Sequence, residues 1–321
     1  QIVTELLQAG HEIIAAKRND QTFTSSFPEV KTLRCDFLKD TTVTAWLPRL
    51  EKVEAVINCV GILDHPLKKN VWKTHYETPR ALYEAAAQQG VKRIIQISAL
   101  GVSQVSVAYA QSKLALDKFL LNFSVPTIIL RPSLVYGRGS YGGTTLFRGL
   151  AGLPGIVPLP GGGGQRFQPI HIEDLAKAVQ QLLTVPLKEN IILNATATER
   201  VTLKEVLIKL RAWLGFGKAK LITIPLSLIR IASWLGNFIP RSSMNATSYK
   251  MMMQDNVSTE TETQRFYSYL DFAPRNFSQG VFSSPASVQD RWHARLVFLK
   301  PLLIFSLAFV FLYTALCNLF P

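Results

Sequence analysis

Residues 91–131 of the chain read VKRIIQISALGVSQVSVAYAQSKLALDKFLLNFSVPTIILR. Two runs rich in isoleucine, at 91–98 and 126–131, flank a helical stretch at 108–123. Apolar runs of this kind, rich in β-branched residues, are typical of strands that are covered on both faces. The stretch therefore predicts a strand, a crossover helix and a second strand that is parallel to the first.

The same alternation extends over the first 200 residues. We expect further strands at 12–16, 30–35, 54–60 and 190–194, and further helices at 70–89 and 172–185. Alternating strands and helices predict an α/β fold with a doubly wound parallel sheet, similar to a Rossmann fold. We assign residues 1–200 to this Rossmann-like domain.

The first ten residues have the pattern of a helix that ends at Gly10. A dinucleotide-binding sheet needs a strand and a glycine-rich turn before such a helix, and the sequence has neither. We therefore expect an N-terminal truncation that has removed the first strand and the glycine-rich loop.

The alternation weakens after residue 200. We expect a small α+β substrate or cap region at 201–282, with helices at 201–215 and 225–236 and a short strand at 221–224. A linker is expected at 283–295. The glycines at 161–164 lack the Lys-Ser/Thr of a phosphate loop, and we expect a flexible flap there.

The last segment, 296–321, is predicted to be a transmembrane helix. No charged residue occurs from Pro301 to Pro321, and a helix of this length spans about 30 Å, the thickness of a bilayer core. Arg291, Arg295 and Lys300 precede it, which places the part of the chain before the helix in the cytoplasm. The alternative is a buried or interfacial helix.

The net charge of +13 could indicate a nucleic-acid partner. Because the basic residues are scattered, we expect no nucleic acid, and we expect anionic lipid and a phosphate-bearing cofactor instead. Cys35, Cys59 and Cys317 are far apart and odd in number. They predict neither a metal site nor a disulfide framework.

Two positions bear on the cofactor. The predicted strand at 12–16 is followed by Lys17 and Arg18, and no acid stands at its tip. Cations at this place favour NADP(H), with NAD possible, unless they are simply solvated loop residues. Asp36 follows the next strand, where it could bind an adenine amino group or equally cap a helix.

A third position lies at the end of the strand at 54–60, which closes with Cys59-Val60-Gly61. Gly61 would let the backbone approach the cofactor. Among the side chains of the following helix, we give His75 little weight as a ligand-contacting residue.

The chemistry is expected at Ser98, Tyr109 and Lys113. Tyr109 and Lys113 are four residues apart and share a helix face, where the lysine cation would lower the pKa of the phenol. Ser98 ends a strand and could bind a substrate oxygen. The alternative is an amphipathic helix with an exposed lysine.

The order of these motifs resembles the extended and atypical short-chain dehydrogenase/reductase superfamily. The motifs are VINCVG (56–61), ISALG (97–101), YAQSK (109–113), LRPSLVYG (130–137) and FQPIHIED (167–174). Within the superfamily, the chain resembles the branch related to the nucleotide-binding accessory subunit of respiratory complex I. The resemblance covers about residues 1–280, and the C-terminal span resembles the first helix of a DoxX-like membrane domain.

The resemblance implies roles for individual residues. Tyr109 would be the general acid/base, Lys113 its partner and a ribose ligand, and Ser98 a ligand of the substrate oxygen. Arg131-Pro132-Ser133 would lie near the nicotinamide. The short separation of Ser98 from Tyr109 suggests a trimmed loop over the site.

We therefore expect an NADP(H)-preferring oxidoreductase that moves a hydride between the nicotinamide and a carbonyl or alcohol at a membrane. Its substrate could be apolar, such as a lipid or a quinone-like molecule. Two alternatives stay open: a sugar or lipid epimerase or isomerase that retains its cofactor, and a non-catalytic nucleotide-binding accessory or assembly protein.

Overall fold

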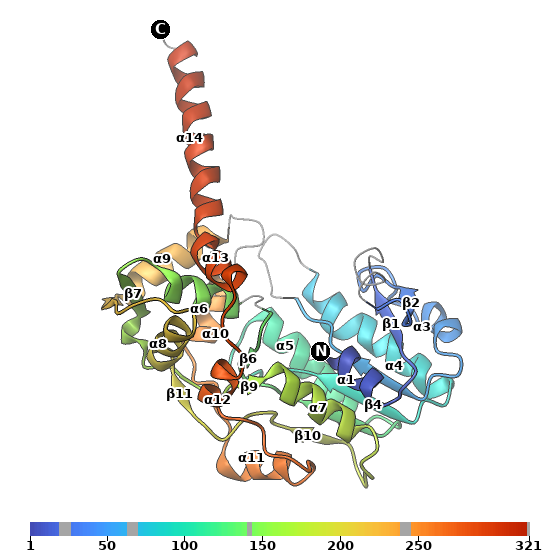
Figure 1. Cartoon of the computed structure of the whole chain (residues 1–321). Helices are drawn as coiled ribbons and strands as arrows, with labels where there is room; N and C mark the ends of the chain where they lie inside the picture. Colours follow the sequence, from blue (N-terminus) through green and yellow to red (C-terminus); the bar gives the residue numbers. More distant parts are fainter. Residues whose placement is uncertain (19–26, 63–69, 140–142, 238–244, 320–321) are drawn as a thin grey trace.

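The computed structural model describes residues 1–18, 27–62, 70–139, 143–237 and 245–319. The chain folds into two regions that lie side by side, and one long helix projects from the second of them (Figure 1). The first region contains the predicted parallel strands.

Four strands form the main sheet: β3 (Ala55–Asn58), β4 (Arg93–Ile97), β5 (Thr127–Leu130) and β10 (Ile191–Leu193). Their order is β10-β5-β4-β3, and every neighbouring pair is parallel. The predicted strands and the doubly wound α/β class are thus confirmed.

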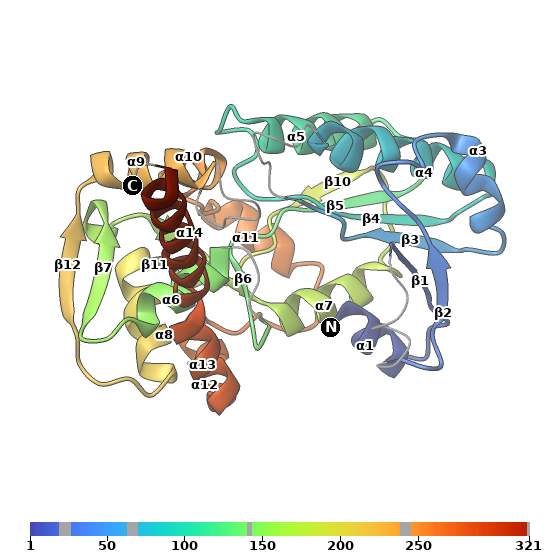
Figure 2. The same cartoon turned by 90° about the horizontal axis from the view of Figure 1, so that it is seen from above.

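Alternate residues of these strands enter two different cores. Ile94 and Ile129 pack under η2 (Lys73–Glu77), α4 (Thr78–Gln88) and α5 (Ala108–Leu121), whereas Ile95 and Ile128 face α7 (Ile172–Leu182). Figure 2 shows α3 (Val43–Trp46), α4 and α5 over one face and α1 (Ile2–Gln8) and α7 over the other. Each fully buried isoleucine contributes about 1.5–3 kcal/mol, so the apolar runs hold both layers.

A second parallel pair, β1 (Ile14–Lys17) and β2 (Lys31–Arg34), stands apart from the main sheet. In the part of the chain that the structure describes, no strand is hydrogen-bonded to both β1 and β3. The short helix η1 (Leu47–Arg49) follows α3 on the way back to β3.

The second region is divided differently from the expected 201–282. It combines residues 135–167 with later ones, because its core joins Phe147, Leu159, Val206, Leu207 and Phe277. Strands from the two stretches pair directly. The pairs are β7 (Ile156–Pro160) with β12 (Lys220–Ile224), β8 (Arg166–Phe167) with β11 (Val201–Thr202) and β6 (Val135–Tyr136) with β9 (Ile170–His171).

The helices of the second region are α6 (Gly143–Gly152), α8 (Leu203–Trp213), α9 (Leu226–Gly236), α10 (Ala246–Met252) and α12 (Phe277–Phe282). By contrast, α11 (Glu260–Tyr267) buries Phe266 in the core of the first region. A boundary at residue 200 is therefore wrong, since the chain crosses between the regions several times.

The expected flap is also wrong. Gly161–Gly163 form the short 3-10 turn η3, and Gly163 is buried against α8, where a Cβ would lie 3.1 Å from the backbone nitrogen of Lys204. All three glycines have positive φ (58°, 83° and 73°). Glycine is needed here for a tight, packed turn.

The expected linker at 283–295 contains a packed helix, α13 (Val288–Leu296). Ser287 and Asp290 form a capping box at its start. Its Ala294 is buried against Gly152 of α6, where a Cβ would lie 3.0 Å from the Cβ of Ala294. The segment is thus a fixed part of the second region.

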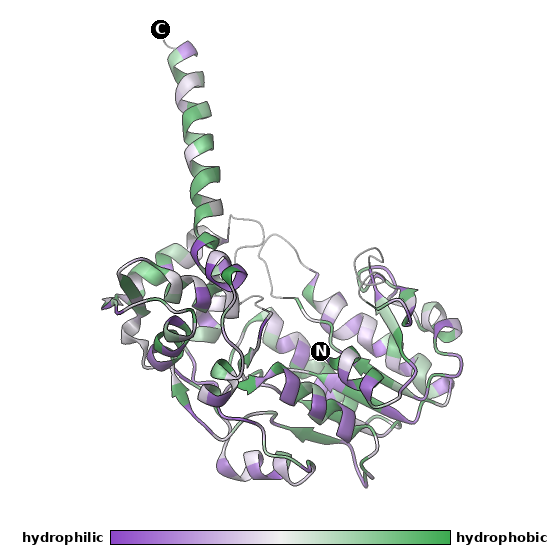
Figure 3. Cartoon of the chain, in the orientation of Figure 1, coloured by the Kyte–Doolittle hydropathy of each residue, from purple (hydrophilic) through white to green (hydrophobic). Residues whose placement is uncertain are grey.

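Helix α14 (Leu299–Leu319) follows α13 and leaves the body of the protein (Figure 1). Its stretch Leu302–Leu319 has a mean hydropathy of 2.2 and no buried residue. Figure 3 shows the helix as an almost unbroken apolar rod. No described residue of Leu302–Leu319 is buried, so this stretch is not a core helix of the two folded regions.

Candidate active site

The candidate site lies where β3, β4 and β5 end. Helix α5 starts here after the extended residue Val107, and its first turns carry Tyr109 and Lys113. Lys113 is only 5% exposed, and its Nζ donates to the carbonyl of Ile97 at 3.1 Å. The alternative of a solvent-exposed lysine is therefore wrong.

The ammonium group of Lys113 lies 5.7 Å from the centre of the Tyr109 ring. Burial lowers the pKa of Lys113 to about 8, although the negative charge of Asp117 acts in the opposite direction. Burial raises the pKa of Tyr109 to about 12. The expected lowering of the phenol pKa is thus not found in the protein alone, because burial disfavours the charged phenolate.

Ser98 is buried, and its hydroxyl donates to Oδ2 of Asp117 at 2.9 Å. The same carboxylate binds the guanidinium of Arg131, with Nε and one terminal nitrogen both at 2.8 Å. Ser98 and Arg131 thus share one buried acceptor. The Ser98 hydroxyl is therefore committed to Asp117, which does not fit the expected role of a ligand for the substrate oxygen.

The residues after Arg131 also have partners within the protein. The carbonyl of the buried Pro132 accepts a hydrogen bond from the backbone of Leu100 at 2.9 Å. The hydroxyl of Ser133 donates to the carbonyl of Asn256 at 2.8 Å. This segment joins the two regions, and its expected place near the nicotinamide stays a prediction.

His75 lies in the π-helical turn η2 and is only 2% exposed. Its Nε2 accepts from the backbone N–H of Ile62 at 3.0 Å, which leaves the proton on Nδ1, 3.0 Å from the hydroxyl of Ser112. The ring stands edge-on to Tyr109, with centroids 5.3 Å apart. His75 therefore ties the loop after β3 to the helix of Tyr109 and Lys113.

The sequence did not predict that His75 would link this loop to α5. The spacing of apolar residues in 70–89 does not predict a π-helical turn. Such turns are frequent at functional sites. Burial, and then the charge of Lys113, lower the pKa of His75 to about 3, so its ring is neutral near pH 7.

The loop at Cys59-Val60-Gly61 offers a cradle for a cofactor. A Cβ on Gly61 would lie 3.8 Å from Nζ of Lys113 and 3.9 Å from Nε2 of His75, so it would fill the space in front of both. Lys113 uses one N–H on Ile97 and keeps donors for a ribose hydroxyl. The residues present thus fit the ribose end of a dinucleotide.

Among the described residues we find no glycine-rich turn that could bind the pyrophosphate. The first glycine of the chain, Gly10, stands after α1 with φ of 81°, whereas a glycine-rich turn would have to precede that helix.

Three cations gather where β1 and β2 end. Lys17 and Arg18 are the predicted pair, and the parallel register sets Arg34 directly beside Lys17. Arg34 was missed, because only the register brings it there. Asp36 follows, and its Oδ1 accepts from the backbone of Leu38 at 3.0 Å, which favours the capping alternative for this carboxylate.

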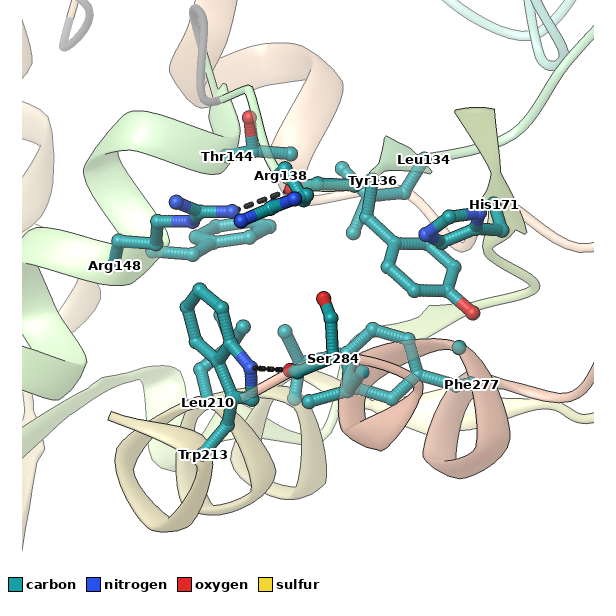
Figure 4. A pocket seen from close by; sticks show the side chains of 15 residues that line it. Leu134, Tyr136, Arg138, Thr144, Arg148, His171, Leu210, Trp213, Phe277 and Ser284 are labelled. Carbon is teal, nitrogen blue, oxygen red and sulfur yellow. Dashed lines mark hydrogen bonds between the residues drawn. The ribbon is translucent and has the colours of Figure 1, made fainter. Parts of the chain in front are cut away.

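A small pocket lies in the second region, between α6, α8, α12 and strands β6 and β9 (Figure 4). Its volume of about 30 Å³ is enough for one water. The walls are largely aromatic, with polar groups from the N-cap residue His171 and from two arginines. The aromatic and arginine residues are Tyr136, Phe147, Trp213, Phe277, Arg138 and Arg148.

The pocket residues were not predicted, because they come from stretches that are far apart in the sequence. Arg148 is held by Asp290 at 3.1 Å, and Trp213 donates to the carbonyl of Ser284 at 2.8 Å. His171 is the N-cap residue of α7.

The profile of the NAD dependent epimerase/dehydratase family matches residues 1–195 of the sequence. The chain belongs to this family. The expected superfamily and its NAD-binding Rossmann fold are thereby confirmed.

Solved structures of similar fold include several that are named for nucleotide sugars. MoeE5 in complex with UDP-glucuronic acid and NAD has 19% identity and a TM-score of 0.64, over 88% of this chain and 92% of that one. UDP-glucose 4-epimerase from Thermus thermophilus, in complex with NAD, has 19% identity and a TM-score of 0.64, over 87% and 92%. The protein gox2253 has 16% identity and a TM-score of 0.67, over 92% and 94%. At these identities the similarity concerns the fold alone.

A curated relative bears on the resemblance to complex I. Subunit 9 of the NADH dehydrogenase [ubiquinone] 1 alpha subcomplex, a mitochondrial protein of Arabidopsis thaliana, is 27% identical over 135 residues. The match covers 40% of this epimerase/dehydratase chain and 33% of the relative. The chain therefore spans about a third of that relative's length.

Proposed function

We propose that the protein is an NADP(H)-dependent oxidoreductase of the short-chain type, which interconverts a carbonyl and an alcohol. The observation that carries the proposal is the placement of Tyr109 and the buried Lys113 beside Gly61, at the ends of the parallel strands. This edge is where doubly wound sheets bind their ligands. A bound dinucleotide would supply or accept the hydride.

Tyr109 acts as the general acid/base at the substrate oxygen. Its pKa of about 12 keeps the phenol protonated, so it can donate to the alkoxide that develops when a carbonyl is reduced. Lys113 holds a ribose hydroxyl and, when charged, stabilises the phenolate that Tyr109 becomes. Its pKa of about 8 leaves it mostly protonated at neutral pH.

The remaining residues position this pair. Ser98 and Arg131 hold Asp117, whose negative charge supports the cation of Lys113. His75 fixes the backbone at Ile62 next to Gly61. In this proposal Ser98 acts through Asp117 and not on the substrate.

The preference for NADP(H) rests on the cations Lys17, Arg18 and Arg34. A 2′-phosphate is a divalent anion that several cations bind better than one. NAD stays an alternative cofactor, because NAD is named in the similar structures MoeE5 and UDP-glucose 4-epimerase.

The membrane forms the second part of the proposal. Helix α14 is long enough to cross a bilayer core and apolar on every side. We propose that it anchors the protein with both folded regions in the cytoplasm, and that the substrate is apolar.

An epimerase, isomerase or dehydratase that retains its cofactor is the second candidate, and the family match favours it. The same Tyr109 and Lys113 would then serve two half-reactions, and the cofactor would be regenerated. A non-catalytic accessory role is the third candidate, in view of the Arabidopsis relative.

The test is Tyr109→Phe, with Tyr76→Phe as the control from the neighbouring turn. We would measure NADPH binding by nicotinamide fluorescence, and NADPH oxidation with a panel of aldehydes, ketones and quinones. An oxidoreductase keeps its binding and loses turnover by roughly 100- to 10,000-fold in Tyr109→Phe alone.

The other candidates give different results. An epimerase contains cofactor that co-purifies and is not consumed. An accessory protein binds NADPH, shows no turnover and keeps its cellular role in Tyr109→Phe.

A further inference from the structure

A second apolar surface lies beside the base of α14. Helix α9 presents Leu228, Ile231 and Trp234, which are 55%, 55% and 59% exposed. Their spacing of three residues places them on one side of the helix. The opposite side, with Ile229 and Ser233, is buried against the second region. The exposed face of α9 is thus an apolar stripe on a folded, packed helix.

The position of α9 ties this stripe to α14. In both views α9 lies on the side of the second region from which α14 projects (Figures 1 and 2). A helix with one buried side and an apolar outer side is the pattern of an interfacial helix that lies in the headgroup layer. Tryptophan is the side chain that prefers this layer.

The charge of the surrounding sequence points to the same partner. Residues 206–254 contain seven Lys and Arg and no Asp or Glu. Among them Lys218, Lys220 and Arg230 are exposed on the segment that leads into α9 and on α9 itself. A cationic segment with an apolar face is complementary to a bilayer that carries anionic lipids.

We propose that the α9 face, formed by Leu228, Ile231 and Trp234, rests in the headgroup layer of an anionic membrane. This rests on the proposed insertion of α14, which holds α9 at the surface. The second region is then attached at two places, by a spanning helix and by an interfacial one. A single spanning helix would leave the folded body free to rotate about its axis, whereas two attachments fix it.

The experiment uses the complete chain in vesicles of phosphatidylcholine, with and without phosphatidylglycerol, whose acyl chains carry bromine as a contact quencher. A fluorescent dansyl amino acid replaces Ile231 on α9. The matched control carries it at Ile208, which is 42% exposed on α8 of the same region. Flotation of the vesicles reports separately whether α14 inserts.

We expect the probe at 231 to be quenched at least roughly twofold more than the probe at 208, and more strongly with phosphatidylglycerol. Arg230→Glu with Lys220→Glu should remove the effect of the anionic lipid.

Equal quenching at 231 and 208 in protein that floats would overturn the α9 inference and leave the anchor intact. Protein that does not float would overturn the anchor and the inference together. If the probe at 231 becomes shielded with protein concentration in detergent, without lipid, the face binds a second copy and the inference is wrong.

Discussion

Ser98 donates a 2.9 Å hydrogen bond to Asp117, and both side chains are buried, 4% and 1% exposed. A serine at the end of the strand before a Tyr-x-x-x-Lys helix invites a catalytic interpretation. Because its hydroxyl donates to Asp117, we interpret Ser98 as a residue that positions Asp117. The catalytic and the positioning interpretations predict different effects of a mutation at Ser98.

Replacing Ser98 with alanine should therefore lower stability more than catalysis. The variant Ser98→Ala loses a hydrogen bond to a charged group, at a cost of about 1.5–3 kcal/mol in the free energy of unfolding. We expect kcat to stay within roughly fivefold of the wild type, and Ser106→Ala, at an exposed serine, to change neither. A loss of turnover by a hundredfold or so, without a change in stability, would restore Ser98 as a ligand of the substrate.

The charge of Asp117 should set the alkaline limit of activity. Asp117 raises the pKa of Lys113 against the effect of burial, and the balance lies at about 8. In Asp117→Asn this support is lost, so Lys113 loses its proton at lower pH. The alkaline limb of kcat/KM against pH should move to lower pH, measured at a temperature where the variant is folded. An unmoved limb would show that Lys113 does not act as a cation.

The neutral state of His75 should make the fold sensitive to acid. Its pKa in the folded protein is about 3, against an ordinary value of 6.5. Between these pH values, His75 is protonated in the unfolded chain but not in the folded protein. The free energy of unfolding therefore falls as the pH decreases from 6.5 towards 3.

The variant His75→Gln removes this contribution, and the difference in unfolding free energy between wild type and variant should shrink on acidification. NADPH should also bind more weakly to the variant, since Ile62 loses its anchor. A difference that does not vary with pH would contradict the buried neutral ring.

The three cations at the ends of β1 and β2 should determine the choice of cofactor. Replacing Lys17, Arg18 and Arg34 with serine removes partners of a 2′-phosphate, and NADPH should bind about 10- to 100-fold more weakly. NADH should be little affected. Lys31→Ser is the matched control, because Lys31 lies at the opposite end of β2. If the affinities for NADPH and NADH fall equally, these cations do not bind the 2′-phosphate of NADPH.

Local patterns were enough for the elements of the first region. Buried strands such as β4 and β5 carry adjacent isoleucines, Ile94-Ile95 and Ile128-Ile129, so their apolar runs mark them directly. The Tyr109–Lys113 spacing is also local, since it needs only one helix. The burial of a side chain, however, depends on residues that are distant in the sequence. Burial is the largest cause of the pKa shifts of Tyr109 and Lys113.

The second region could not be divided correctly for the same reason. Its core brings Phe147 together with Val206 and Phe277, and nothing at residue 147 indicates partners so far along the chain. The partnership of Ser98 with Asp117 is similar, because it depends on the rotamer of a serine and on the depth of a helix. Arg34 becomes visible only once the register of β1 and β2 is known.

Asp290 has two partners that belong to different parts of the molecule. It caps α13, which leads into α14, and it pairs with Arg148, which lines the pocket. A tilt of α14 that is passed on to α13 must either break this ion pair or carry Arg148 with it. The wall of the pocket is thereby linked to the angle of the long helix. Under the proposed membrane anchor, a change in bilayer thickness that tilts α14 would act on the second region through this ion pair.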